Sequence, residues 1–286
     1  MNARLPAPSA PWFAELQLGF AARDGRSVLI HNRHQGPLRV QKALYPEGAA
    51  VCQAMVLHPP SGIAGGDELN MKINVGEAAH AQLTTPGAGK WYRSGGPSAA
   101  QNLQLQVANG GSLEWLPQES IVFDGAIARM GTRIELAADA CFIGWDILCL
   151  GRVASGEAFR HGELSTQMRI ERAGQALWLE RGRVSGGDPM LASPAGWAGL
   201  PVCATLLCTF PGLDSEASSL LSKLRTINPT GEAGAHHGIT ALPGLLLARY
   251  LGSNSEAARQ WLTELWKILR PACCGRPAVP PRIWQT

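Results

Sequence analysis

The sequence predicts a mainly β protein with two α-helices in its C-terminal part. Apolar and polar residues alternate with a period of two along many segments, as they do in half-buried strands. Gly, Pro and Asn separate these segments at intervals of roughly 8–12 residues, which is typical of layered all-β proteins. An apolar period of about 3.6 residues, the mark of an amphipathic helix, appears only after residue 213.

The alternation is clearest in LNMKINV, where Leu69, Met71, Ile73 and Val75 fall on one face. NLQLQVA (102–108) repeats this pattern. CFIGWDILCLG (141–151) is apolar on both faces, so we expect a central strand that is covered on each side. Further strands are predicted in SVLIHN (27–32), AQLTT (81–85), TRIELAA (132–138), LSTQMRIE (164–171), QALWLER (175–181) and GLLLARYLG (244–252).

Two segments have helical periodicity. DSEASSLLSKLRTI (214–227) carries a leucine stripe, and Asp214 is its expected N-cap. EAARQWLTELWKIL (256–269) has a wide apolar face and a capping segment at 253–255, and Pro271 is expected to end it. The final PAVPPRIWQT is expected to be structural, because it is apolar and rich in proline.

Composition narrows the class of protein. The net charge is +3 with no basic run, which argues against a nucleic-acid protein. No stretch of about 18 apolar residues is present, so no membrane span is predicted. The N-terminus lacks the apolar core of a signal peptide, and seven scattered cysteines favour a reduced, cytoplasmic protein. Only 16% of residues are charged and nine are Trp, which suggests a partner-binding surface.

The domain organisation is predicted to be simple. Residues 1–11 form an N-terminal tail and 12–286 form a single domain. The Gly- and Pro-rich stretch 184–201 is the best candidate for a hinge.

One stretch, HPPSGIAGGDEL (58–69), combines rigid and permissive residues before two acids, Asp67 and Glu68. Two prolines fix an extended entry, and three glycines permit positive φ and close approach of another group. The stretch is either a tight connection between strands or a rigid turn that positions carboxylates, and local chemistry does not separate these readings.

The sequence lacks complete versions of several catalytic and binding motifs. TPGAGKW resembles the end of a phosphate-binding loop, but Thr84 stands where Gly is needed and Trp91 where Ser or Thr is needed. No GxSxG elbow is present. The adjacent pairs Cys273/Cys274 and His236/His237 can each supply a metal ligand, but no second pair lies at the spacing of a zinc site.

Two acidic residues lie within apolar segments. Asp146 lies in GWDILCL and Glu180 in LWLERGR, and a carboxylate in such a run is costly unless it is paired or binds a cation. Ion pairing with Arg181 or Arg183 is one explanation for Glu180. Asp146 has no local partner, so a special role is favoured as much as a structural one.

Four stretches in this order and spacing resemble the urease accessory protein UreD (UreH) family. They are GPLRVQKALYPEG, HPPSGIAGGDEL, TTPGAGKWYRS with SLEWLPQESIVFDGA, and LRPACCGRPAVPPRIWQT; WDILCLGR adds to the set. The resemblance runs from about residue 12 to the C-terminus. The CC pair at 273–274 departs from the family pattern.

The resemblance implies a fold, a function and partners. The fold is a stack of β-sheets of β-helix-like type with two α-helices. The function is non-catalytic: a scaffold that helps to insert nickel into apo-urease together with UreF and the GTPase UreG, in a 2:2 type assembly through UreF. No cofactor of its own is implied, only transient Ni²⁺.

The family also has a proposed internal passage for nickel, and its carboxylates match Asp67, Glu68, Asp146 and Glu180. Oxygen ligands that hold Ni²⁺ weakly suit such a passage. A competing hypothesis is a β-sheet hydrolase that uses Asp67 or Glu68 with Asp146 as an acid–base pair.

Overall fold

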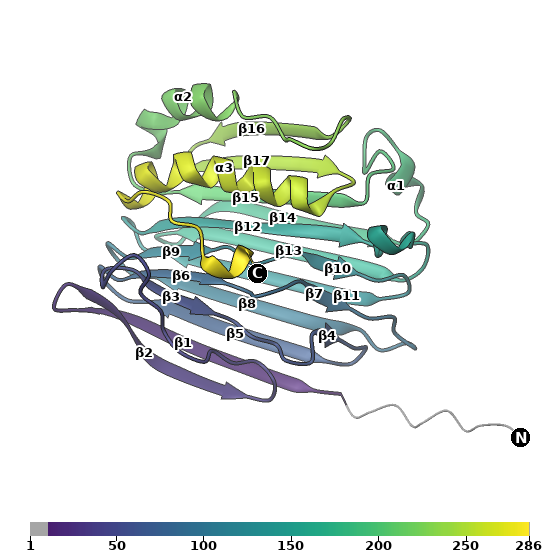
Figure 1. Cartoon of the computed structure of the whole chain (residues 1–286), viewed down its shortest axis with the longest axis horizontal. Coiled ribbons are helices and arrows are strands. Elements are labelled where there is room, and N and C mark those ends of the chain that lie inside the picture. Colours follow the sequence, from purple (N-terminus) through teal and green to yellow (C-terminus); the bar gives the residue numbers. More distant parts are fainter. Residues whose placement is uncertain (1–10, 286) are drawn as a thin grey trace, which may run out of the picture.

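Residues 11–285 are described by the computed structural model of the chain, and they form a β-solenoid of about four turns with few helices. The predicted mainly β, β-helix-like fold is therefore confirmed (Figure 1). The predicted tail falls almost wholly outside the described residues. The single domain and the hinge at 184–201 stay predictions.

Two sheets form the walls of the solenoid. The first has the strand order β14-β13-β11-β8-β5-β1-β2. Its strands are β1 (Phe13–Arg23), β2 (Arg26–Gln35), β5 (Glu68–Val75), β8 (Ala99–Val107), β11 (Ile127–Leu136), β13 (Glu163–Arg172) and β14 (Gln175–Ser185). Its central strands are parallel, and antiparallel hairpins close it at both edges.

The second sheet faces the first and has the path β16-β17-β15-β12-β10-β7-β4, with β3, β6 and β9 joined to it through β12. Its strands are β3 (Cys52–Met55), β4 (Gly62–Ile63), β6 (His80–Thr84), β7 (Gly89–Trp91), β9 (Ser112–Trp115), β10 (Ser120–Val122), β12 (Cys141–Leu150), β15 (Val202–Thr209), β16 (His236–Leu242) and β17 (Leu245–Gly252).

Each turn of the solenoid crosses the first sheet once and returns through the second. In the first sheet Glu68 pairs with Ala100, Ala99 with Ala128, and Ile127 with Glu163. The turns therefore differ in length, which explains why the sequence shows no fixed-period repeat. Outward-facing amides stack between turns, and Asn102 Nδ2 donates to Asn70 Oδ1 at 2.9 Å.

The predicted alternation places the core correctly. Leu69, Met71, Ile73 and Val75 are all buried on the inner face of β5. β12 is the expected central strand, since it pairs with β15 and with both β9 and β10. Burial of these apolar faces contributes about 25 cal/mol per Å² and is the main source of stability.

The helices lie against the second sheet. α3 (Ser255–Cys274) packs across β12 and β15, as Figure 1 shows, and its buried face includes Trp261, Leu262, Leu265, Trp266 and Leu269. α2 (Leu213–Leu224) follows β15. One short helix, α1 (Pro189–Ala192), and two 3-10 turns, η1 (Val153–Ser155) and η2 (Arg282–Gln285), complete the elements.

Two details of the predicted helices are wrong. The N-cap of α2 is Gly212, at φ 84°, and Asp214 lies inside the helix, where its carboxylate accepts the Gly244 N–H at 2.7 Å. Pro271 does not end α3; the helix continues to Cys274 and stops at Gly275, which is at φ 63°. Asn254 caps α3 within the predicted segment, accepting from two N–H groups.

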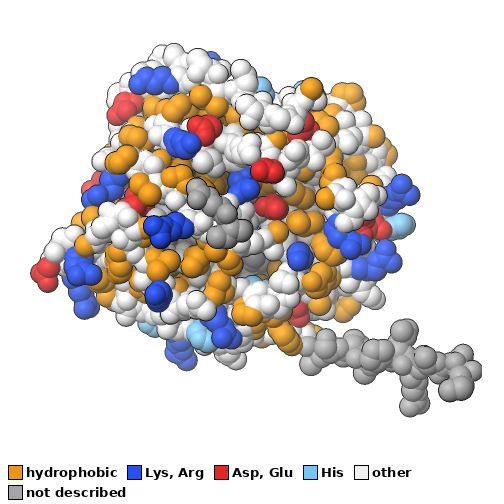
Figure 2. Space-filling model, in the orientation of Figure 1, with side chains coloured by type: hydrophobic (Ala, Val, Ile, Leu, Met, Phe, Trp, Pro, Cys, Tyr) orange, Lys and Arg blue, Asp and Glu red, His pale blue; other side chains and the backbone are white. Residues whose placement is uncertain are grey.

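Most of the tryptophans lie in the interior, so their number does not by itself indicate a partner-binding surface. Trp91, Trp115, Trp145, Trp261 and Trp266 are buried, and in the described part of the chain only Trp12 is largely exposed. On the face that carries α3, charged side chains are scattered among hydrophobic and uncharged ones (Figure 2). Among residues 11–285, no helix has the length and apolar character needed to cross a membrane.

The C-terminal segment is structural, as predicted. After α3 it returns across the second sheet, and Trp284 Nε1 donates to Thr84 Oγ1 at 2.9 Å. The Trp284 ring also contacts Trp145 and Trp266, with centroid separations of 5.5 and 5.9 Å. These contacts join the end of the chain to its first half.

Candidate functional site

A cavity of about 870 Å³ lies between the inner faces of the two sheets. Its walls come from β5, β8, β11, β13 and β14 on one side and from β12, β15, β16 and β17 on the other, and the segment after α1 contributes Trp197. Most of the lining is apolar. Charged and ligand-bearing side chains gather toward the β14–β17 end, among them Asp146, Glu180, Cys203, His236 and Arg249, while His58 lines the cavity from the 58–69 stretch. The ring of His237 packs instead against Trp261 of α3, on the other face of the sheet.

Strand register explains why several of these residues meet. Asp146 of β12 is paired with Thr205 of β15, and Thr205 with Arg249 of β17. The three residues therefore form one row across the second sheet, and all three line the cavity. Glu180 comes from β14 of the first sheet and reaches Arg249, with Oε1 2.5 Å from Nη2. Two of the four predicted carboxylates, Asp146 and Glu180, thus share one cavity.

Asp146 has the most perturbed carboxyl group of the site. Burial raises its pKa to about 7, the nearby Glu180 carboxylate adds to that rise, and the Arg249 guanidinium acts against it. A carboxyl group that titrates near neutrality readily releases its proton to water when a cation binds. Cys203, in the same cavity, has a pKa that burial and the Asp146 charge raise to about 12, so it stays a thiol.

The partner of Glu180 differs from the one that the sequence suggested. Its carboxylate binds Arg249, 69 residues away, and also accepts the indole N–H of Trp178 at 3.2 Å. Arg183 is paired with Glu163 instead, at 2.7 Å. The local explanation of Glu180 is therefore wrong, because neighbours along a strand alternate between faces.

Asp67 and Glu68 lie apart from Asp146 and Glu180, since neither is among the residues that line the cavity. Asp67 is buried, and its two oxygens accept the N–H groups of Trp12 and Ala64, each at 2.8 Å. Glu68 is exposed on the outer side of β5 and accepts from Asn70 Nδ2 at 3.0 Å. Asp67 therefore closes a turn, and Glu68 belongs to the outer surface.

The glycines of the 58–69 stretch serve close packing. A Cβ on Gly62 would lie 1.9 Å from the ring of Tyr92, and one on Gly65 would lie 2.3 Å from Ser94 Oγ. Gly66 has φ 95°. The stretch is thus a tight connection in which the ring of Tyr92 lies directly over the backbone, and its acids do not point into the cavity as a pair.

Sequence reasoning missed part of the site. His236 and His237 were recognised only as an adjacent pair that can supply a metal ligand; they lie on β16, where His236 faces the cavity and the His237 ring packs against Trp261. Arg249 was not singled out, and Cys203 was considered only as a zinc ligand with Cys208, a pairing that strand alternation excludes. What places these residues in the site is the register of β12, β15 and β17, and that register is known only once the strands are paired.

Comparisons with known proteins show the family of the chain. The chain matches the family of the UreD urease accessory protein over residues 13–285. It is 63% identical to the urease accessory protein UreD of Dechloromonas aromatica, over the full length of both chains. It is 49% identical to that of Azoarcus sp. strain BH72, covering 99% of this chain and 97% of the relative, and 52% identical to that of Pseudomonas fluorescens strain Pf-5, covering 99% of each.

The chain is therefore an accessory protein of urease maturation, of a non-catalytic class. It belongs to the UreD family. The hydrolase hypothesis is wrong: the family is not catalytic, and Asp67 and Glu68 do not share the cavity with Asp146.

Proposed function

We propose that this chain supports urease maturation as the scaffold of a cytoplasmic nickel-insertion complex, and that its internal cavity gives Ni²⁺ a path. The partners of the complex would be UreF, the GTPase UreG and apo-urease, in a 2:2 type assembly through UreF. The observation that carries the proposal is the meeting of Asp146 and Glu180, from opposite sheets, in one cavity.

The chemistry of the cavity suits a cation in transit. Asp146 and Glu180 offer oxygen ligands, and His236 lies in the same lining. Arg249 already neutralises Glu180, so a cation must compete with the guanidinium and is held weakly. Weak, sequential contacts allow release, which a closed set of strong ligands would prevent.

Asp67 and Glu68 fit this path less well. Both oxygens of Asp67 are occupied by backbone N–H groups, and Glu68 is exposed outside the cavity. We therefore limit the proposed nickel contacts within the cavity to Asp146 and Glu180. Glu68 remains a candidate only for an entrance or exit on the outer surface.

The test is co-expression of each variant with urease and the other accessory proteins. Asp146→Asn and Glu180→Gln keep side-chain shape but remove the charge that attracts a divalent cation. We expect both variants to form complex in a UreF pull-down, and urease activity and nickel content to fall about tenfold.

Glu77→Gln serves as the matched control, because it removes an exposed carboxylate outside the cavity. It should leave nickel content within about twofold of the wild type. Full nickel loading in both cavity variants would exclude the path while leaving the role in urease maturation intact. Loss of UreF binding in either variant would show a structural role instead.

A further inference from the structure

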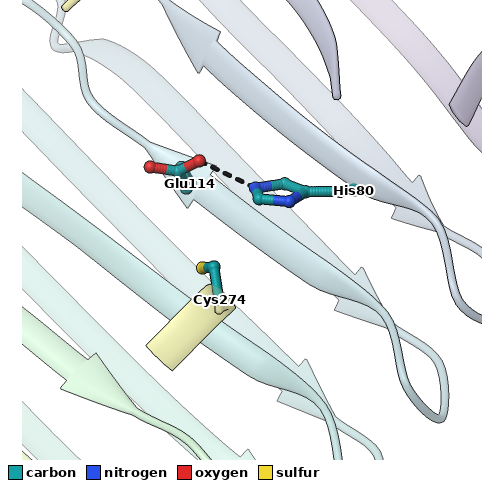
Figure 3. Close-up of side chains that lie close together, drawn as sticks. All are labelled: His80, Glu114 and Cys274. Atoms are coloured by element: carbon teal, nitrogen blue, oxygen red, sulfur yellow. Dashed lines mark hydrogen bonds and ion pairs between the residues drawn. The ribbon is translucent and has the colours of Figure 1, made fainter. Parts of the chain in front are cut away.

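His80, Glu114 and Cys274 form a second group of ligand-bearing side chains, outside the cavity. His80 lies on β6, Glu114 on β9, and Cys274 is the last residue of α3 (Figure 3). Their ligand atoms all lie within 4.8 Å of one another, and His80 Nε2 is 2.7 Å from Glu114 Oε1. Among residues 11–285, this is the only such group of three.

The group is on the far face of the second sheet from the cavity. Leu113 and Trp115 point into the solenoid, so Glu114, between them on β9, points toward α3. His80 and Glu114 are buried, whereas Cys274 is partly accessible at the helix end. The group therefore has an approach from the C-terminal end of α3.

One imidazole, one carboxylate and one thiol are the ligand types that Zn²⁺ binds in proteins. In a tetrahedral site with metal–ligand distances of about 2.0–2.3 Å, ligand atoms lie roughly 3.3–3.8 Å apart. The His80–Glu114 separation of 2.7 Å is shorter than this, and the other ligand-atom separations do not exceed 4.8 Å, so an ion could enter if the imidazole and the carboxylate moved slightly apart. The remaining position would take a water or an amide.

Gln82 gives an independent indication of a missing ligand. It is 1% exposed, and neither its side-chain oxygen nor its nitrogen has a hydrogen-bond partner. Gln82 is two residues from His80 on β6 and is in register with Glu114 of β9, so the three side chains share a face. Buried polar groups are nearly always satisfied, and an ion with a bound water here would satisfy this amide.

The surrounding charges tolerate a divalent cation. Arg270 Nε lies 3.0 Å from Glu114 Oε1, and the same guanidinium binds Glu47. When His80 is protonated and Cys274 is a thiol, these two glutamates and two cations sum to zero. A divalent ion that displaces one proton from each of His80 and Cys274 leaves that sum unchanged, which avoids an uncompensated buried charge.

We propose that His80, Glu114 and Cys274 bind one thiophilic divalent cation such as Zn²⁺, separately from the nickel path. The ion would join β6, β9 and α3, with Arg270 and Trp266 holding the Glu114 carboxylate in place. Trp266 Nε1 donates to Glu114 Oε2 at 2.7 Å. The bound ion would thus hold the C-terminal helix against the solenoid.

The test measures Zn²⁺ binding by the full chain after bound metal has been removed. Two samples are compared, one kept folded throughout and one refolded in the presence of Zn²⁺. We expect about one Zn²⁺ per chain by equilibrium dialysis and elemental analysis, and a rise in melting temperature. Co²⁺ should give a thiolate-to-metal charge-transfer band. Cys274→Ser should lower affinity at least tenfold and abolish that band, and His80→Gln should also weaken binding.

Cys149→Ser is the matched control, because Cys149 is buried beside Ser255 at the opposite end of α3. It should bind Zn²⁺ like the wild type. Circular dichroism must show that each variant is folded. If His80→Gln does not fold, the result for Cys274→Ser alone decides whether the proposal holds. Stoichiometry and affinity unchanged by Cys274→Ser, or no binding by either native or refolded wild type, would overturn the proposal.

Discussion

Arg249 and Glu180 join the two sheets of the solenoid across the end of its cavity, with Nη2 and Oε1 2.5 Å apart. Arg249 is on β17 and Glu180 on β14, and these strands belong to different sheets. The guanidinium carbon also lies 5.9 Å from the centroid of the Trp178 ring. This ion pair therefore controls both the closure of that end and the charge available near Asp146.

A double-mutant cycle should detect this pair. Arg249→Met and Glu180→Gln, singly and together, are expected to show an interaction energy of about 1 kcal/mol in urea unfolding, a modest value because both side chains are partly accessible. The Arg183–Glu163 pair, whose arginine is 72% exposed, is the control and should give about 0.5 kcal/mol or less. Equal values for the two pairs would contradict a special role.

The stability of the protein should depend on pH through Asp146. Its pKa in the folded chain is about 7, above the ordinary value of 3.8, so the unfolded state loses this proton first as pH rises. Ionisation then favours unfolding, and the carboxyl costs stability increasingly between pH 4 and 7.

Asp146→Asn removes this dependence. As pH rises from 4 to 7, we expect the melting temperature of the variant to increase relative to that of the wild type. The corresponding change in relative unfolding free energy is about 2 kcal/mol, a value reduced for solvent screening because the side chain faces a cavity. Asp24→Asn, in an exposed turn, should show no such trend. A constant difference across this range would refute the assigned cause.

Arg270 should be among the most sensitive residues of α3. It is fully buried and binds both Glu47 and Glu114. Arg270→Met leaves the Glu47 carboxylate without a counter-ion and Glu114 with His80 alone, and a loss of about 3–5 kcal/mol is expected in chemical denaturation. Lys267→Met, which breaks an exposed pair with Glu264 on the same helix, should change stability by less than about 0.5 kcal/mol.

The C-terminal segment should be required for a stable protein. Trp284→Ala removes two aromatic contacts and the bond to Thr84, so we expect a loss of about 2–4 kcal/mol in thermal unfolding. Truncation after Leu269 should abolish soluble complex with UreF. Arg282→Ala, at an exposed neighbour, is the control. Wild-type stability in Trp284→Ala would show that the segment is dispensable.

The TPGAGKW segment should not bind nucleotides. Gly89–Trp91 is the strand β7, and the Gly89 N–H is already donated to Glu119 O at 2.9 Å. Thr84, which breaks the phosphate-loop pattern, is used to hold Trp284. Isothermal titration of the chain with GTP and ATP should show no binding, and micromolar affinity would contradict this assignment.

Local sequence patterns were enough to predict most of the long strands and the α3 core, because burial follows directly from periodicity, but β1 and β15 were not predicted. The helix ends were harder: Gly212 displaced Asp214 as the cap, since Asp214 is used by Gly244 of a distant turn. The site was predicted only in part. Asp146 and Glu180 stood out as acids in apolar strands, but their meeting depends on strand pairing and sheet packing.

Other relationships depend on contacts that no local pattern contains. Glu180 finds Arg249 rather than its neighbouring arginines, and Cys274 meets His80 only because α3 extends past Pro271. Asp67 shows the opposite case. Its turn was recognised, but the carboxylate serves the backbone of that turn and of the incoming strand.

The ion pairs of Arg270 also set an order of events during synthesis. Glu47 and Glu114 precede Arg270 by 223 and 156 residues, so both leave the ribosome long before it. The early turns of the solenoid can form as they emerge, and His80 is then already available to Glu114, whereas Glu47 still lacks its counter-ion. We therefore expect the region around Glu47 to reach its final packing only when the last helix is released, near the end of translation.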